Sequence, residues 1–139
     1  MKTKIEILEF IKRHQVCVLA TSSKTGKPEA AAIEFAETDN FELIFDTFST
    51  YRKYPNLKAN PNVAVVIGWE DATVQYEGVA TEVDGEEMEE LKNIFVKKNP
   101  GASKFFDIPE TRYFKVTPEW LRYRDYSTTP ETLIELTEF

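Results

Sequence analysis

The stretch that decides the fold is residues 41–83, FELIFDTFSTYRKYPNLKANPNVAVVIGWEDATVQYEGVATEV. It reads as a strand, a hydroxyl-rich turn, two adjacent cations, a short helix, an Asn-Pro pair and an apolar strand. Hydroxyl donors, free backbone N–H groups and two positive charges meet where the first strand ends and the helix begins, which suits an anionic phosphate. We interpret this spot as the phosphate site of a cofactor. The residues assigned to it are Thr47, Ser49, Arg52 and Lys53.

Composition and charge narrow the classes of partner. The chain has 139 residues and a formal charge of −7, from 17 Lys and Arg against 24 Asp and Glu. Nucleic acids and anionic membranes reward clustered cations, so neither is an expected partner, although one small phosphate ligand remains compatible. No apolar run approaches the roughly 20 residues that span a bilayer, and the N-terminus lacks a signal-peptide core. We therefore expect a cytoplasmic protein.

The single cysteine and the single histidine offer no framework for a disulfide or a metal site. Cys17 lies in an apolar strand pattern, which predicts a small buried side chain. His14 follows a predicted helix and reads as a surface residue near the helix C-terminus. No metal site is expected, and no spacing of carboxylates identifies a catalytic acid–base pair, so the catalytic residues remain unassigned.

Periodicity predicts a mainly β domain over residues 1–126, built as a small antiparallel barrel with peripheral helices. The first three strands read as a meander, and two late strands flank Pro118. The tail, residues 127–139, is predicted to be partly disordered or packed on a partner subunit. Helices are predicted over residues 3–14, 55–59 and 85–98, and strands over 15–22, 29–37, 41–47, 62–69, 74–83, 112–117 and 120–126.

The order of these motifs resembles the FMN-binding split-barrel family related to pyridoxamine 5′-phosphate oxidase, over roughly residues 5–126. No single motif is specific, and the ordered series carries the resemblance. The matching pieces are Val18-Leu19-Ala20-Thr21, Gly26-Lys27-Pro28, Phe45-Asp46-Thr47, Arg52-Lys53, Leu57, Asn60-Pro61, Val63–Ile67, Val74-Gln75-Tyr76, Gly78-Val79-Ala80 and Trp120.

The resemblance implies an antiparallel split β-barrel of about six or seven strands that forms a homodimer, with FMN in the clefts between subunits. It implies that Arg52 and Lys53 hold the phosphate, with Thr47 near the ribityl chain or phosphate. It places Gln75 at the isoalloxazine, and brings Trp120 and Arg122 across from the partner. The strand that borders the flavin ring is implied to be Glu29, Ala30, Ala31, Ala32 and Ile33.

Three departures separate the chain from the oxidase proper. Tyr51 stands where the family has a serine, and Glu29 stands where its flavin-side strand begins with arginine. The late run Arg122-Tyr123-Arg124 lacks the histidine of the oxidase's Arg-x-His pair. We therefore expect a flavin-dependent oxidoreductase acting on a small molecule, and not a true pyridoxamine 5′-phosphate oxidase.

Other interpretations stay open. The chain could be a non-catalytic flavin-binding or storage module, a barrel that has lost its cofactor, or a haem- or deazaflavin-binding relative. Arg52 and Lys53 also fit a solvated cationic turn, and Gln75 an exposed strand position. The two tryptophans fit a core or a dimer interface that involves no flavin.

Overall fold

More buried and more exposed side chains alternate along the strands, so one face of each strand lies in a common core. In β1 (Val16–Ser22), the side chains of Cys17, Leu19 and Thr21 are buried, and those between them face outward. Burial raises the pKa of the Cys17 thiol to about 12, so this residue is a small apolar core group, as predicted.

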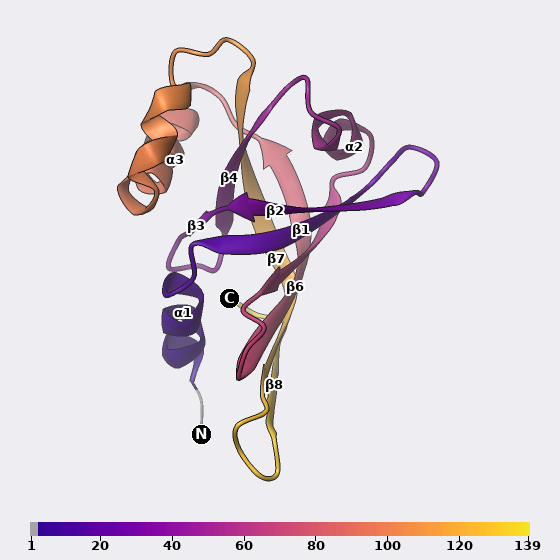
Figure 1. Cartoon of the computed structure of the whole chain (residues 1–139), viewed down its shortest axis with the longest axis vertical. Helices are drawn as coiled ribbons and strands as arrows, with labels where there is room; N and C mark the ends of the chain where they lie inside the picture. The colour runs from indigo at the N-terminus through magenta and orange to yellow at the C-terminus, as the bar shows by residue number, and fades with distance from the viewer. Residues whose placement is uncertain (1–2) are drawn as a thin grey trace.

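The computed structural model describes residues 3–139, in which eight strands form one antiparallel sheet flanked by α-helices and a 3₁₀-helix (Figure 1). The predicted fold class, a mainly β antiparallel split barrel, is confirmed. The helices are α1 (Lys4–Lys12), α2 (Lys53–Ala59), α3 (Gly85–Lys98) and η1 (Pro100–Phe105). The other strands are β2 (Pro28–Glu34), β3 (Ala36–Glu37), β4 (Leu43–Phe48), β5 (Asn62–Ile67), β6 (Ala72–Glu82), β7 (Thr111–Asp125) and β8 (Thr132–Leu136).

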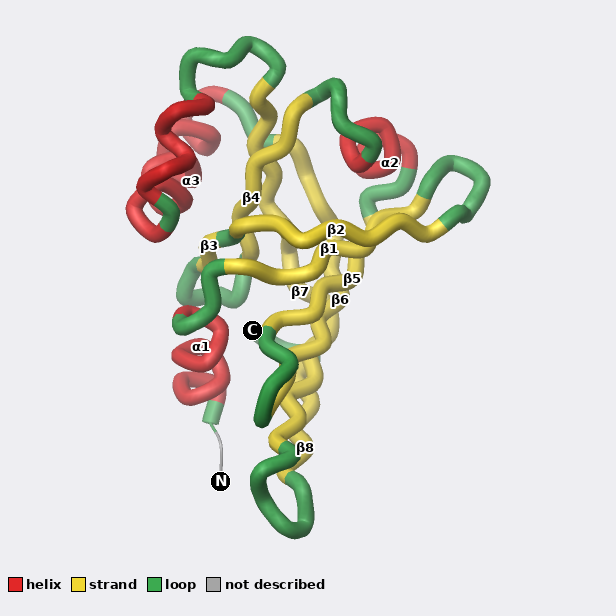
Figure 2. The backbone as a smooth tube through the Cα atoms, viewed as in Figure 1, coloured by secondary structure: helices red, strands yellow, loops and turns green. Residues whose placement is uncertain are grey.

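The sheet curls because its two ends are consecutive in the chain. The strand order is β2-β1-β5-β6-β7-β4-β3, and only Phe35 separates β2 from β3 in sequence. Figure 2 shows β1 and β2 running across β4, β6 and β7, with helices around the outside. The seam between β2 and β4 is the split of the barrel.

The predicted three-strand meander is confirmed only in part. β1 pairs with β2 as expected. β4 pairs along its whole length with the distant β7, and on its other side it pairs only with the two residues of β3. Phe45 of β4 stacks on Phe114 of β7 with ring centroids 5.4 Å apart. Burial of such long-range aromatic contacts decides the pairing, which local turn signals do not encode.

Helix boundaries follow capping chemistry. The Thr3 hydroxyl accepts a hydrogen bond from the Glu6 N–H at 3.3 Å, which confirms the predicted cap of α1. The boundaries of α3 also agree with prediction. Helix α2 begins two residues earlier than predicted, so Pro55 is its third residue. The first-turn N–H groups of a helix have no intrahelical acceptor, so Pro55 removes no helical hydrogen bond.

The end of the chain differs from prediction. β7 is one continuous strand through Pro118, which lies opposite Gly78 at a register shift in the β6–β7 ladder. A bulge interrupts the ladder, so the missing N–H of proline is tolerated there. The tail supplies β8, which pairs with residues 121–125 of β7 in the same chain. No helix among the described residues is long and apolar enough to cross a membrane.

Candidate functional site

A hollow of about 180 Å³ lies between the β1–β2 hairpin and the start of α2. Both predicted phosphate cations border it, because Arg52 directly precedes α2 and Lys53 begins it. The remaining walls come from Leu19, Thr21, Pro28, Glu29, Ala30 and Ala31. The structure therefore brings the adjacent cations and the first half of the predicted flavin-side strand into one cavity.

Arg52 is already engaged by a carboxylate. Its guanidinium donates to Glu29, which also accepts a hydrogen bond from Asn56 Nδ2 at 2.6 Å. Asn56 Nδ2 lies 3.1 Å from Thr21 Oγ1 as well, so β1, β2 and α2 are joined by one polar network. The Arg52 hydrogen bond, and next the Asn56 hydrogen bond, hold the pKa of Glu29 below its usual range. Arg52 is thus neutralised within its own chain.

Lys53 has no such partner. No carboxylate oxygen among residues 3–139 lies within 4 Å of its Nζ, whose nearby ring is that of Tyr51, with the centroid 5.3 Å away. The side chain is half-buried, and burial lowers the pKa of Lys53, an effect that the negative charge of Asp46 only partly opposes. A partly desolvated ammonium without a carboxylate in contact is unfavourable, which makes this position receptive to an anion.

Three buried oxygens on β4 and β7 have no hydrogen-bond partner among the described residues, and the charge of one of these residues, Asp46, acts on Lys53. They are Asp46 Oδ2, Thr47 Oγ1 and the Tyr113 hydroxyl, and Asp46 and Tyr113 are direct cross-strand neighbours. Asp46 borders two further hollows, of about 230 and 110 Å³, and Thr47 borders the smaller one. Buried polar atoms are nearly always hydrogen-bonded, so these orphans indicate a place where a ligand or water completes the structure.

The predicted flavin-side strand presents two faces. Glu29, Ala31 and Ile33 pair with the inward-facing residues of β1, whereas Ala30 and Ala32 pair with outward-facing ones. Successive strand side chains point to opposite faces, so the five side chains divide between the two faces of β2, and the expectation that the backbone and side chains of this strand border a flavin ring stays a prediction. Only the inward set faces the seam between β2 and β4.

The other predicted residues lie elsewhere. Gln75 is exposed, and Trp120 and Arg122 are half-exposed on the outer face of β6 and β7. Arg122 is held by Glu135 of β8, with Nε 3.0 Å from Oε1. Ser49 is in the turn after β4, where its N–H donates to the Glu110 carbonyl at 2.8 Å. Within one chain, these residues do not join the hollow beside Lys53.

Sequence reasoning missed Asn56 and Asp46. Asn56 is in a short polar helix, and nothing in its spacing distinguishes it from a solvated residue. Asp46 belongs to the matching piece Phe45-Asp46-Thr47, but neither that piece nor the spacing of the carboxylates assigns it a role. The sequence held one usable signal for it, a charged residue within the apolar run of β4.

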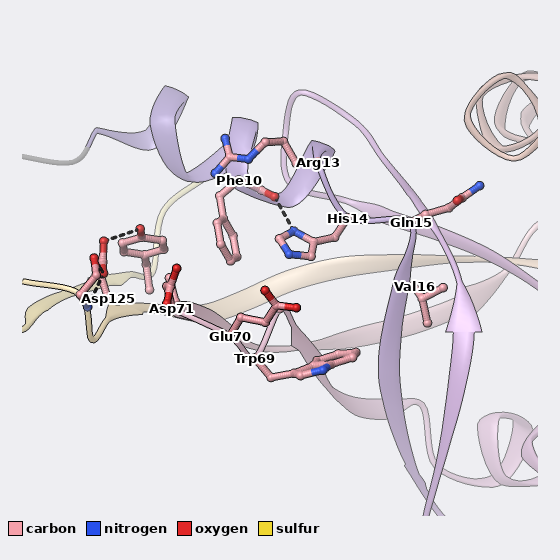
Figure 3. A pocket seen from close by; sticks show the side chains of 13 residues that line it. Phe10, Arg13, His14, Gln15, Val16, Trp69, Glu70, Asp71 and Asp125 are labelled. Carbon is pink, nitrogen blue, oxygen red and sulfur yellow. Dashed lines mark hydrogen bonds between the residues drawn. The ribbon is translucent and has the colours of Figure 1, made fainter.

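A wider hollow of about 620 Å³ lies at the other end of the barrel, between α1 and the β5–β6 turn (Figure 3). His14 borders it and is half-buried, not a plain surface residue. Its Nδ1 lies 2.8 Å from the Phe10 carbonyl, which only accepts, so Nδ1 is the donor of this hydrogen bond. The exposed Trp69 borders the same hollow, so this tryptophan is not a core residue of the chain.

This curled antiparallel sheet defines the split-barrel class of protein. The chain belongs to the pyridoxamine 5′-phosphate oxidase family, whose family model matches residues 3–125. No protein of curated function matches the sequence.

Solved structures share the fold at low sequence identity. A haem-binding protein from Mycobacterium smegmatis is 18% identical with a TM-score of 0.84, and the match covers 99% of this chain and 59% of that protein. The haem storage protein HutZ from Vibrio cholerae is 19% identical with a TM-score of 0.75, covering 86% and 92%. A putative pyridoxamine 5′-phosphate oxidase from Listeria innocua is 24% identical with a TM-score of 0.74, covering 88% and 98%. This chain spans little more than half of the mycobacterial protein.

Proposed function

We propose that this protein binds FMN at the seam between β2 and β4 and acts as a flavin-dependent oxidoreductase on a small molecule. The observation that carries the proposal is Lys53, a half-buried ammonium at the edge of a hollow with no carboxylate oxygen of residues 3–139 within 4 Å. A phosphate monoester supplies the missing charge and hydrogen-bond acceptors. Family membership makes a flavin the cofactor to test first.

The residues present fit the group. Lys53 would hold the phosphate, and the orphaned Thr47 hydroxyl would donate to an oxygen of the cofactor tail. Glu29, Ala31 and Ile33 would face the ring system from β2. When bound, flavin supplies a hydride acceptor and donor at its N5 position. The chain contributes binding, orientation and exclusion of water.

The proposal is tested by the absorption spectrum of the purified protein and by FMN titration. A yellow protein, or saturable uptake of added FMN, supports it. Reduction of bound FMN by a nicotinamide donor, followed by reoxidation by a substrate, favours an enzyme over a flavin store. A colourless protein that takes up no FMN would leave a barrel without the cofactor.

Glu29 competes with the phosphate for Arg52, which leads to a prediction. Glu29→Gln removes the charge that neutralises Arg52 while keeping an amide that Asn56 can contact. We expect FMN to bind roughly three- to tenfold more tightly, because an exposed cation regains its attraction for the phosphate. Quenching of FMN fluorescence measures the affinity. Unchanged affinity would mean that Arg52 does not reach the ligand.

We also propose a homodimer through the outer face of the sheet. On this face, small apolar side chains of neighbouring strands lie next to one another in rows across the sheet. These rows continue to the predicted site residues that lie outside the hollow, Gln75, Trp120 and Arg122. One row runs through Ala30, Ala20, Ala64, Glu77 and Trp120, and the next through Ala32, Val18, Val66, Gln75, Arg122 and Glu135. An apolar, half-exposed sheet face favours association, and a second copy is the route by which Trp120 and Arg122 would approach the flavin.

Ala64→Arg tests the dimer. Ala64 is exposed at the centre of the outer face, where a buried charge is incompatible with close packing. We expect the variant to be monomeric in light scattering at concentrations where the unmodified protein is dimeric. Glu90→Arg, on the exposed side of α3, is the matched control and should remain dimeric. A dimeric Ala64→Arg would place the interface elsewhere.

Haem is a second candidate, which rests on similarity to proteins named for haem binding and on the position of His14 at the border of the 620 Å³ hollow. The lining of that hollow includes Glu70, Asp71 and Asp125 against the single cation Arg13, a balance that disfavours haem propionates. The same absorption spectrum separates the candidates. A Soret band on haem addition, lost in His14→Ala, would favour haem over FMN.

A further inference from the structure

Asp46 is a carboxyl group whose Oδ2 is left without a hydrogen-bond partner among residues 3–139 by the packing of the fold, although its own backbone N–H donates to the carboxyl group. It lies in the last part of β4, on the side that faces η1, and borders both small hollows at the seam. Its Oδ2 is buried and unpaired among the described residues. An apolar residue here would pack without this unfavourable desolvation, so the carboxyl calls for a functional explanation.

The groups that face Asp46 come from four elements. Glu34 of β2 is close enough to disfavour its ionised form, and Lys53 of α2 favours it. Tyr113 of β7 is its direct cross-strand neighbour, with a hydroxyl that burial keeps protonated by raising its pKa to about 12. Lys104 of η1 borders the larger hollow with Asp46. Of these groups, Lys53 also borders the candidate phosphate site. The charge of an ionised Asp46 therefore acts on the cation that would hold the phosphate.

We propose that Asp46 couples anion binding at Lys53 to proton uptake, so that the site accepts a phosphate-bearing cofactor more readily when Asp46 is protonated. This inference rests on the proposed function and adds a specificity-determining residue to the same site. Tyr51 links the two positions in space, because it lines the smaller hollow with Asp46 and its ring centroid lies 5.3 Å from Lys53 Nζ.

The direction of the coupling follows from charge. Burial, and then the charge of Glu34, raise the pKa of Asp46 to about 6, while Lys53 lowers it. A phosphate bound at Lys53 offsets that cation and brings a like charge towards Asp46, so the pKa of Asp46 rises further. The protein should therefore take up part of a proton on binding near pH 7. By reciprocity, protonation of Asp46 strengthens binding by the same factor.

The test compares FMN binding by the unmodified protein and by Asp46→Asn, which keeps the side-chain shape and removes the titration. Isothermal calorimetry near pH 7, in buffers of different ionisation enthalpy, measures protons taken up per FMN. Protonation changes of the cofactor phosphate and of Lys53 contribute to the measured proton uptake in both proteins. The difference in proton uptake between the two proteins therefore measures the contribution of Asp46. We expect lower uptake in Asp46→Asn, roughly three- to tenfold tighter binding at pH 8, and similar affinities at pH 5.

Asp39→Asn is the matched control, because Asp39 is an exposed carboxylate whose partner is Lys12, in α1. It should bind FMN as the unmodified protein does at every pH. Equal proton uptake and equal pH dependence in Asp46→Asn would overturn this inference and leave the proposed function standing. Absence of FMN binding in both proteins would overturn the two together. Near-ultraviolet circular dichroism verifies that each variant keeps its packing.

Discussion

Lys53→Ala is expected to weaken FMN binding about 10- to 100-fold, whereas Arg52→Ala should weaken it much less. A hydrogen bond to a charged group contributes about 1.5–3 kcal/mol, and Lys53 offers one that no carboxylate of its own chain satisfies at short range. Arg52 is about three-quarters exposed and bound to Glu29, so the chain itself satisfies much of its charge. The structure thereby distinguishes two adjacent cations that look equivalent in the sequence.

Fluorescence titration of FMN against the two single variants and the double variant measures this difference. Lys97→Ala, an exposed lysine of α3, controls for the general loss of one positive charge from an acidic protein. Because the side chains are adjacent, their effects need not add, and the double variant reports the coupling. Full affinity in Lys53→Ala would refute the phosphate assignment, and a larger loss in Arg52→Ala would mean that Glu29 releases Arg52 on binding.

Gly78→Ala is expected to reduce the free energy of unfolding by about 2–4 kcal/mol. A Cβ atom at Gly78 would lie 2.4 Å from the Thr117 carbonyl oxygen and 2.9 Å from Val116 Cγ1. The oxygen belongs to the backbone of β7, so it yields only if the β6–β7 ladder opens at the bulge. This ladder is the longest in the sheet, and it supports both β4 and β8.

Urea denaturation followed by tryptophan fluorescence gives the unfolding free energies. Gly101→Ala is the matched control, because a Cβ there meets no atom within 4 Å and the position is in η1, outside the sheet. We expect its stability to change by less than about 1 kcal/mol. A Gly78→Ala protein as stable as the control would show that the two strands separate at the bulge without strain.

Much of the fold was predictable, because local chemistry determines its pieces. Thr3 and the acidic and basic ends of α3 specify helix boundaries through capping and dipole interactions. Alternation specifies β6 and its polar outward face at Gln75. The pairing of β4 with β7 was not predictable, since it brings together residues about seventy positions apart whose complementarity appears only when their aromatic side chains are buried together.

The sequence predicted which residue types form the candidate site. It did not predict which of them are already paired, or on which face of a strand they lie. The sequence placed cations after a hydroxyl-rich turn, and the structure shows them at one hollow. Only the tertiary structure shows that Arg52 is paired with Glu29 and that Asn56 connects β1, β2 and α2. It also shows that the side chains of Ala30 and Ala32 lie on the outward face of β2. These properties depend on which strands lie side by side.

The sequence by itself determined the kinds of element, their order along the chain, the acidic composition and the cation pair after the hydroxyl-rich turn, because propensity, capping and periodicity act over a few residues. The tertiary structure alone decided where the seam of the barrel lies, which of the two cations has no carboxylate in contact, and that Asp46, with its buried Oδ2, acts on that cation through space. Burial and electrostatic interaction depend on distance through space, and the curling of the sheet sets those distances.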